Sequence, residues 1–142
     1  ADDPRIGFAI SDLSKGNVTA RVRFKIPKGN SGFFLRADKQ TLAGYEVEVD
    51  ATKRTGGFWE VRGRNWVTGP EDNAGVNPND WNELTASLHG DRIVFHLNGQ
   101  KTVDLPNDTQ GRKEGHIALQ VHGAKNPSEV WFKDIEILEP VR

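Results

Sequence analysis

The sequence predicts an all-β domain, a sandwich of two antiparallel sheets or a jelly roll, and three observations support this fold class. Polar and apolar residues alternate in about ten short segments, repeating roughly every 8–15 residues. Fifteen glycines and seven prolines punctuate the chain, as in a fold with many turns. No stretch shows the apolar period of a helix. With 142 residues, the chain has the size of one domain with a real core.

Each expected strand is a run of alternating residues between turn signals. The ranges are 6–10, 18–26, 31–38, 44–50, 58–64, 81–88, 92–97, 100–105, 115–123 and 130–138. The dipeptide Asn98-Gly99 predicts a hairpin, and the polar stretch 68–80 predicts a long loop. The side chains expected to face the core are Val18, Ala20, Val22, Phe24, Ile26, Phe33, Leu35, Ala37, Tyr45, Val47, Val49, Leu84, Ala86, Leu88, Ile93, Phe95 and Leu97.

Composition argues against several classes of protein. Lysine plus arginine is 19 and aspartate plus glutamate is 20, a net charge of -1 without the basic excess of a nucleic-acid or membrane-surface protein. No apolar run approaches the ~20 residues of a membrane span. Cysteine is absent, which excludes disulfides, thiolate metal sites and a cysteine nucleophile. The opening Ala1-Asp2-Asp3-Pro4 suits a mature N-terminus after signal-peptide removal, and a domain cut from a longer protein fits equally well.

The segment 44–50 carries three acids on one face. Alternation places Tyr45, Val47 and Val49 on one side of the strand and the acidic residues on the other, and these acids are Glu46, Glu48 and Asp50. Same-face neighbours lie roughly 6.6 Å apart, and like charges at that range raise the pKa of at least one carboxyl. Such a group can serve as an acid beside a base. The alternative is a solvated acidic strand balanced by arginines on its neighbours.

Residues of two other strands are candidates for the same face, because they are the non-core half of their strands. They are Phe34 and Arg36 in one strand and Gln120 and His122 in the other. If that sheet is concave, its polar face becomes a ligand cleft. The alternative is a solvated sheet surface on which arginine and glutamate form ordinary cross-strand pairs.

A glycine-rich segment supplies a third candidate group. Trp66 beside Arg64 suits a sugar, whose C–H face stacks on an aromatic ring while its hydroxyls bond to charged groups. Trp59 is expected in the core. Asp72 and Asn73 in the long loop could contact calcium, but two oxygens do not make a site. We therefore expect no cofactor, and a divalent metal stays open.

Several motifs occur in the order of one known family. They are residues 30–36 (NSGFFLR), 44–50 (GYEVEVD), 81–82 (WN), 97–99 (LNG), 115–123 (GHIALQVHG) and 130–137 (VWFKDIEI). Over residues 18–138 the chain resembles the 3-keto-disaccharide hydrolase domain family. The resemblance implies a concanavalin A-like jelly roll, similar to laminarinase-type glycosidases, in a secreted or periplasmic bacterial protein that acts on glycosides.

The resemblance also implies site residues. The matching positions are Arg36, Glu46, Glu48, Gln120 and His122. The three acids resemble the E-x-D-x-E strand of laminarinase-type enzymes, with Glu48 in place of the middle aspartate. The N-terminal phenylalanine-asparagine-glycine-lysine segment usual in the family is missing, which also fits a non-catalytic copy.

Three hypotheses for function follow. The first is an enzyme that cleaves glycosides of 3-keto sugars by elimination. His122 or Glu48 would be the base, Glu46 the acid, and Arg36 would stabilise the developing enolate. Direct hydrolysis by two carboxylates is a variant of this hypothesis. Asp50, Arg64, Trp66 and Gln120 would bind the substrate. The second is a carbohydrate-binding module without chemistry, and the third a protein-interaction sandwich. In the first two the partner is an oligosaccharide or glycoside, with other domains of a longer chain as further partners.

Overall fold

The computed structural model describes residues 7–121 and 128–138, and all eleven elements that it contains are strands. They are β1 (Gly7–Lys15), β2 (Val18–Lys28), β3 (Asn30–Ala37), β4 (Gly44–Asp50), β5 (Phe58–Val61), β6 (Asn65–Thr68), β7 (Asn82–His89), β8 (Arg92–Leu97), β9 (Gln100–Leu105), β10 (Gly115–Val121) and β11 (Glu129–Leu138). Among these residues no helix is long and apolar enough to cross a membrane.

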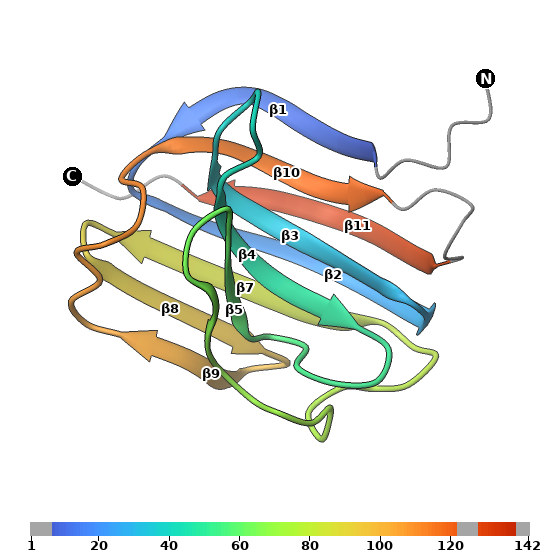
Figure 1. The fold of residues 1–142 in the computed structure, drawn as a ribbon. Helices are drawn as coiled ribbons and strands as arrows, with labels where there is room; N and C mark the ends of the chain where they lie inside the picture. Colours follow the sequence, from blue (N-terminus) through green and yellow to red (C-terminus); the bar gives the residue numbers. More distant parts are fainter. Residues whose placement is uncertain (1–6, 122–127, 139–142) are drawn as a thin grey trace.

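The strands form two antiparallel sheets packed face to face (Figure 1). The six-stranded sheet has the order β1-β10-β3-β4-β5-β6, and the five-stranded sheet has the order β11-β2-β7-β8-β9. The predicted all-β sandwich is therefore confirmed. The strand expected over 58–64 ends early, because β5 stops at Val61. A turn in which Arg62 and Asn65 have positive φ angles of 55° and 64° then leads into β6, a strand that was not expected.

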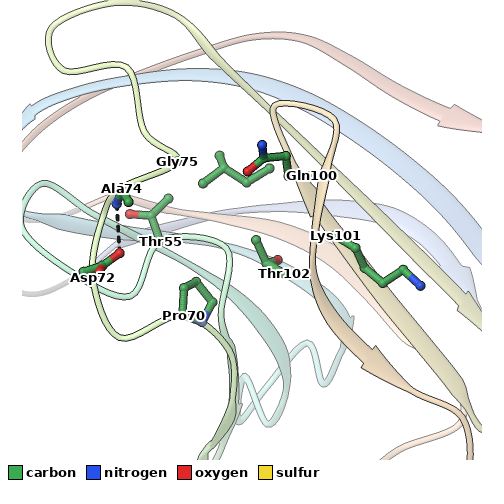
Figure 2. Close-up of a pocket in the computed structure, with 9 residues that line it drawn as sticks. Thr55, Pro70, Asp72, Ala74, Gly75, Gln100, Lys101 and Thr102 are labelled. Carbon is green, nitrogen blue, oxygen red and sulfur yellow. Dashed lines mark hydrogen bonds between the residues drawn. The ribbon is translucent and has the colours of Figure 1, made fainter.

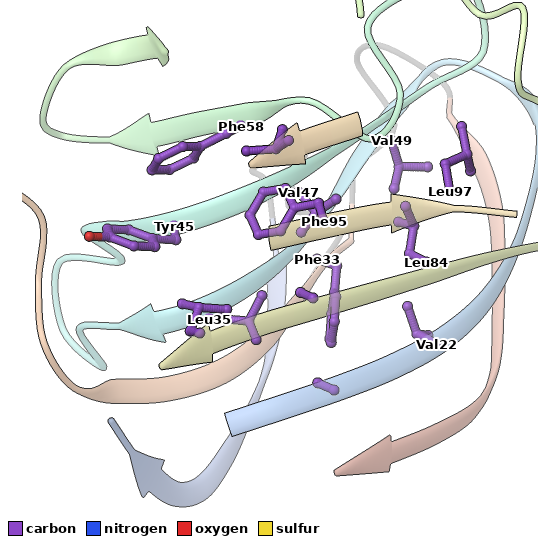
Figure 3. Close-up of a cluster of buried hydrophobic side chains, with 14 of the residues drawn as sticks. Val22, Phe33, Leu35, Tyr45, Val47, Val49, Phe58, Leu84, Phe95 and Leu97 are labelled. Atoms are coloured by element: carbon purple, nitrogen blue, oxygen red, sulfur yellow. The ribbon is translucent and has the colours of Figure 1, made fainter. Parts of the chain in front are cut away.

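The core between the sheets is made by the alternating side chains of both (Figure 3). Of the residues expected to face it, all except Ala37 are buried in this one cluster. Tyr45, Phe58 and Phe95 link the sheets through aromatic contacts, with ring centroids 4.8 Å and 5.8 Å apart for the successive pairs. Burial of this apolar surface fixes which face of each strand points outward.

A β-bulge interrupts the alternation in β3. On β10, His116 pairs with Ala37 and Ala118 pairs with Phe34, so two residues of β3, Leu35 and Arg36, stand opposite one residue of β10. Arg36 has a φ of 51°, the backbone signature of this irregularity. After the bulge the alternation is shifted by one residue, so Ala37 points to the outer face of the sheet. The prediction that Ala37 faces the core is therefore wrong.

Ala37 instead joins a small apolar cluster on the outer face of the six-stranded sheet. Its buried members are Phe34, Ala37 and Ala118, with Val61 packed against them. This cluster makes part of the outer face apolar, and a ligand site can form on that apolar surface.

Candidate functional site

A groove of about 380 Å³ lies on the outer face of the six-stranded sheet. It crosses the adjacent strands β10, β3, β4 and β5. The residues that line it are Asn30, Phe34, Glu46, Glu48, Trp59, Val61 and Gln120. The structure thus brings together Glu46, Glu48 and Gln120, three of the residues predicted from the sequence.

Glu46 is a buried acid for which no described residue serves as a hydrogen-bond donor. The residue is 6% exposed, and burial and the charge of Glu48 are the influences on its carboxyl group. The carboxyl lies over Gly32, where the Cβ of any other residue would overlap it. Burial, followed by the charge of Glu48, raises the pKa of Glu46 well above its usual value. Glu46 therefore holds its proton at pH values where an exposed glutamate has lost it.

Glu48 stands two residues further along the same face of β4 and is 9% exposed. Burial raises its pKa to about 7, and the hydrogen bond that Asn30 donates to its Oε1 at 2.7 Å opposes that shift. A carboxyl with this pKa exchanges its proton near neutrality, as a general base must. Asn30 was not predicted for the site; its position opposite the acidic end of β4 is the signal that could have found it.

Asp50 occupies the end of β4 and supports a turn. Its Oδ1 accepts hydrogen bonds from the amides of Thr52 and Lys53 and from the Thr52 hydroxyl, and its Oδ2 accepts one from Asn30 at 3.1 Å. Partial burial works against ionisation, but these bonds hold the pKa of Asp50 below its usual value. The structure therefore places Asp50 beside the groove, with both oxygens in hydrogen bonds.

Trp59 and Gln120 line the groove on the strands to either side of the acids. The expectation that Trp59 lies in the core is wrong, because alternation in β5 turns Phe58 inward and Trp59 outward. That alternation was visible in the sequence. Gln120 is 8% exposed, and no described residue bonds to its side-chain amide, so this donor and acceptor pair is available to a ligand.

Arg36 does not share the face of the acids, contrary to expectation. Its side chain is 1% exposed and donates to three backbone carbonyls: Gly16 at 3.0 Å, Arg112 at 3.1 Å and Gly90 at 3.0 Å. The guanidinium also lies 5.6 Å from the ring centre of Tyr45, a core residue. The bulge in β3 is the cause, since it turns Arg36 inward, where it ties three turns together.

Arg64 is likewise engaged elsewhere. It forms paired hydrogen bonds with Glu60 (2.9 and 3.0 Å) and with Asp108 (2.7 and 3.0 Å), and Asp108 also accepts a bond from the Tyr45 hydroxyl at 2.5 Å. Bonds from Arg64 are the main reason why the pKa of Glu60 is lowered. Asp108 comes 44 residues later in the chain, so sequence spacing could not reveal this ion cluster.

Trp66 pairs with Trp59 in register and therefore lies on the same face, one strand beyond the groove. The guanidinium of Arg54 stacks 4.7 Å from its ring centre. The structure thus places Trp66 next to the groove lining. The predicted His122 lies outside the described residues.

No group of three potential metal ligands occurs within residues 7–121 and 128–138. Asp72 accepts the Ala74 amide at 3.0 Å, whereas Asn73 bonds to Thr55 and Asp50. Asp72 lines a separate hollow of about 300 Å³ between the loop after β6 and strand β9 (Figure 2). That hollow does not contain the acids of β4.

The groove can therefore hold a proton donor and a proton acceptor on one apolar floor. Glu46 holds its proton more strongly because burial and the charge of Glu48 both raise its pKa, and Glu48 holds its proton less strongly because the hydrogen bond from Asn30 favours its charged form. Two like residues whose environments separate their pKa values are suited to acid and base roles.

Solved structures with the same fold include proteins of carbohydrate recognition and processing. The carbohydrate-binding module CBM66 from Bacillus subtilis has a TM-score of 0.76 at 20% identity, over 96% of this chain and 84% of that one. A protein from Parabacteroides distasonis described as a candidate glycosyl hydrolase also has a TM-score of 0.76, at 17% identity, over 96% and 84% of the two chains. A tetrameric galectin from the sponge Cinachyrella has a TM-score of 0.54 at 13% identity, over 92% and 97%.

These likenesses show the jelly-roll fold of galectins and concanavalin A-like proteins. No curated protein matches the sequence. A family model matches residues 1–138, nearly the whole chain, which confirms the resemblance seen in the sequence motifs. The chain belongs to the family of 3-keto-alpha-glucoside-1,2-lyase-like domains.

Proposed function

We propose that this domain binds a 3-keto-glucoside in the groove and cleaves its glycosidic bond by elimination. The observation that carries the proposal is the pair Glu46 and Glu48. Glu46 is a buried acid with no hydrogen-bond donor among the described residues, and the pKa of the neighbouring Glu48 carboxyl is about 7. Membership of the lyase-like family and the carbohydrate names of the structural neighbours support it.

The chemistry uses the acidity that a ketone at C3 gives to the proton on C2. Glu48, in its ionised form, removes that proton, and the electrons of the C2–H bond form the enolate. The enolate then expels the glycosidic oxygen from C1, leaving a C1–C2 double bond, while Glu46 gives its proton to the departing oxygen. After the reaction Glu48 carries a proton and Glu46 has lost one, and proton exchange with water returns both residues to their starting forms. The elimination needs no oxidant or reductant.

Other groove residues have supporting roles in this proposal. The ring of Trp59 offers an apolar surface for the sugar face. The Gln120 amide lines the groove and can donate to the ketone oxygen as negative charge develops there. This replaces the role expected of Arg36, whose guanidinium is occupied by three carbonyls.

One observation favours a second candidate, a carbohydrate-binding module. None of the described residues that line the groove is a cation, a kind of group that can stabilise an enolate. CBM66 is a carbohydrate-binding module of the same fold. In this candidate Glu46 and Glu48 accept hydrogen bonds from sugar hydroxyls and transfer no proton.

A matched pair of substrates separates the two candidates. Aryl 3-keto-glucosides with hydrogen or deuterium at C2 are incubated with the domain, and aryl alcohol release is followed together with the sugar product. Elimination predicts an unsaturated keto sugar and slower release from the deuterated substrate, and the variants Glu46→Gln and Glu48→Gln each lose most of the rate. Saturable binding by titration calorimetry without turnover would replace the lyase by the binding module.

A secreted or periplasmic location stays a prediction from the family resemblance.

A further inference from the structure

A second hollow, of about 180 Å³, adjoins the groove at the end of β5. The two share Val61, which lines both. Beyond Val61 the second hollow is bordered by Arg62 and by Arg112 of the loop that precedes β10. We call it the arginine annex. The annex brings two cations next to a groove in which the described lining residues include none.

The register of the strands places the annex beside the proposed acid. Gly44 and Val61 are paired, and both line the annex; Glu46 and Trp59 are the next outward pair, and both line the groove. Two residues along a strand span roughly 6.6 Å, comparable with the length of a pyranose unit. A group attached to the oxygen that Glu46 protonates can therefore reach the annex.

Both arginines are oriented by one backbone carbonyl each. The Nε of Arg62 donates to Thr41 at 2.7 Å, and the Nε of Arg112 donates to Arg36 at 2.8 Å. This leaves the terminal NH₂ groups to face other partners, and such groups bind oxyanions in pairs. No described carboxylate forms an ion pair with Arg62, and the carboxylate of Asp38 approaches Arg112 only to 3.8 Å.

Glu60 is the acid in the annex lining, and its charge is already neutralised. Both of its oxygens accept bonds from Arg64, and those bonds are the main reason its pKa lies below the usual value. Arg64 itself is held by Asp108 on its other side. The charge of Arg112 is partly balanced by Asp38, at 3.8 Å, so Arg62, which has no ion pair with a described carboxylate, gives the annex its positive charge.

From this arrangement we infer that the leaving group of the substrate carries an oxyanion, a carboxylate, sulfate or phosphate, which the arginine annex binds. The inference rests on the proposed function, because Glu46 as the acid sets which end of the glycoside points to the annex. It narrows the substrate class from any 3-keto-glucoside to one with an anionic aglycone.

The test compares two probes that differ only in charge, 4-carboxyphenyl and 4-carbamoylphenyl 3-keto-glucoside. Titration calorimetry of the Glu46→Gln variant gives both affinities without turnover. We expect the carboxylate to bind about tenfold more tightly at low salt, as charge-assisted hydrogen bonds would give. The ratio should fall towards one in 0.5 M NaCl, where the Debye length is about 4 Å, compared with about 30 Å at 0.01 M salt. The matching sulfate and phosphate esters rank the three oxyanions.

Arg62→Gln should reduce the carboxylate-to-amide ratio to near one, whereas Arg92→Gln, at an exposed site on the other sheet, should leave the ratio as it is. Arg112→Lys keeps a charge and should retain part of the ratio, and a thermal melt confirms that each variant is folded. Equal affinity for the two probes would contradict the inference that the annex binds an oxyanion. So would a carboxylate-to-amide affinity ratio that is unchanged in Arg62→Gln. Binding affinity tests the arginine annex, whereas product release tests the proposed elimination. A negative result for one proposal can therefore be told apart from a negative result for the other.

Discussion

The carboxyl group of Glu46 lies over Gly32, a residue of the neighbouring strand that pairs with Glu48. A Cβ at position 32 would overlap this carboxyl, so the bare backbone of Gly32 makes the room in which Glu46 is buried. One glycine thus positions the acid, and its strand partner is the base of the proposed reaction.

Gly32→Ala should displace the Glu46 carboxyl and lower the rate of 3-keto-glucoside cleavage at least about tenfold, since acid catalysis depends on placement. The measurement is kcat/KM on an aryl 3-keto-glucoside. Gly75→Ala is the matched control, because its Cβ would meet only Leu97, at 3.3 Å, away from the groove. Equal rates for the two variants would show that the Glu46 position is not required.

Glu48→Gln should stabilise the folded domain above neutral pH. The folded-state pKa of Glu48 is about 7, above the usual glutamate value of 4.5, so the free energy of unfolding of the wild type falls as pH rises from about 4.5 through 7. The variant cannot ionise and escapes this loss, so its advantage is absent at pH 4 and reaches about 1–3 kcal/mol at pH 8. Urea unfolding at the two pH values measures it.

The exposed Glu83→Gln serves as the reference for that experiment. A Glu48→Gln advantage that is the same at pH 4 and pH 8 would contradict the raised pKa.

The rate of cleavage should follow a bell-shaped dependence on pH. Glu48 must lose its proton to act as base, so kcat/KM rises as pH passes through about 7. Glu46 must keep its proton to act as acid, and its pKa is raised well above the usual value, so the rate falls again when that group ionises. The two apparent pKa values belong to the pair because the carboxyls interact. In the residual activity of Glu46→Gln, the decrease of kcat/KM at high pH should be absent. If that decrease is still present, Glu46 is not the acid of the reaction.

Arg36→Met should destabilise the fold by about 3 kcal/mol, because the buried guanidinium is lost together with its hydrogen bonds to three backbone carbonyls. Chemical denaturation is the measurement. Arg21→Met is the control: its ion pair with Glu136 is exposed on both sides, so the change should stay below about 1 kcal/mol. Retained stability together with lost sugar binding would return Arg36 to the substrate-binding role expected from the sequence.

Trp59→Ala should weaken sugar binding roughly three- to tenfold, the loss expected for one stacked ring. Trp66→Ala should have a smaller effect, since Trp66 lies one strand further out and stacks against Arg54. Trp131→Ala is the control, because that ring is 53% exposed on the opposite sheet. Calorimetric titration with a glycoside ranks the three variants.

Much of the fold was predictable because alternation is a local property of the chain. The period of two identified the core of both sheets and placed Glu46 and Glu48 together on the outer face of β4, and both placements agree with the structure. The same rule would have placed Trp59 outward. The ordered motifs identified the family, which the family model confirms.

What failed depended on contacts between distant parts of the chain. Arg36 was expected beside the acids, but a bulge opposite β10 turns it inward, and such a bulge arises only when two strands pair. The ion pair of Arg64 with Asp108, 44 residues later in the chain, could not be foreseen for the same reason, and the role of Arg64 in substrate binding stays a prediction.

Side-chain periodicity was enough to assign the all-β class, the inward and outward faces of most strands and the pair of acids that share a face. Which outward residues become neighbours depends on strand pairing: Asn30, Trp59 and Gln120 lie beside the acids, and Arg62 and Arg112 line the adjoining hollow. The physical reason is that the pKa and the reach of a side chain depend on burial and on partners from other strands, which the order of residues does not specify.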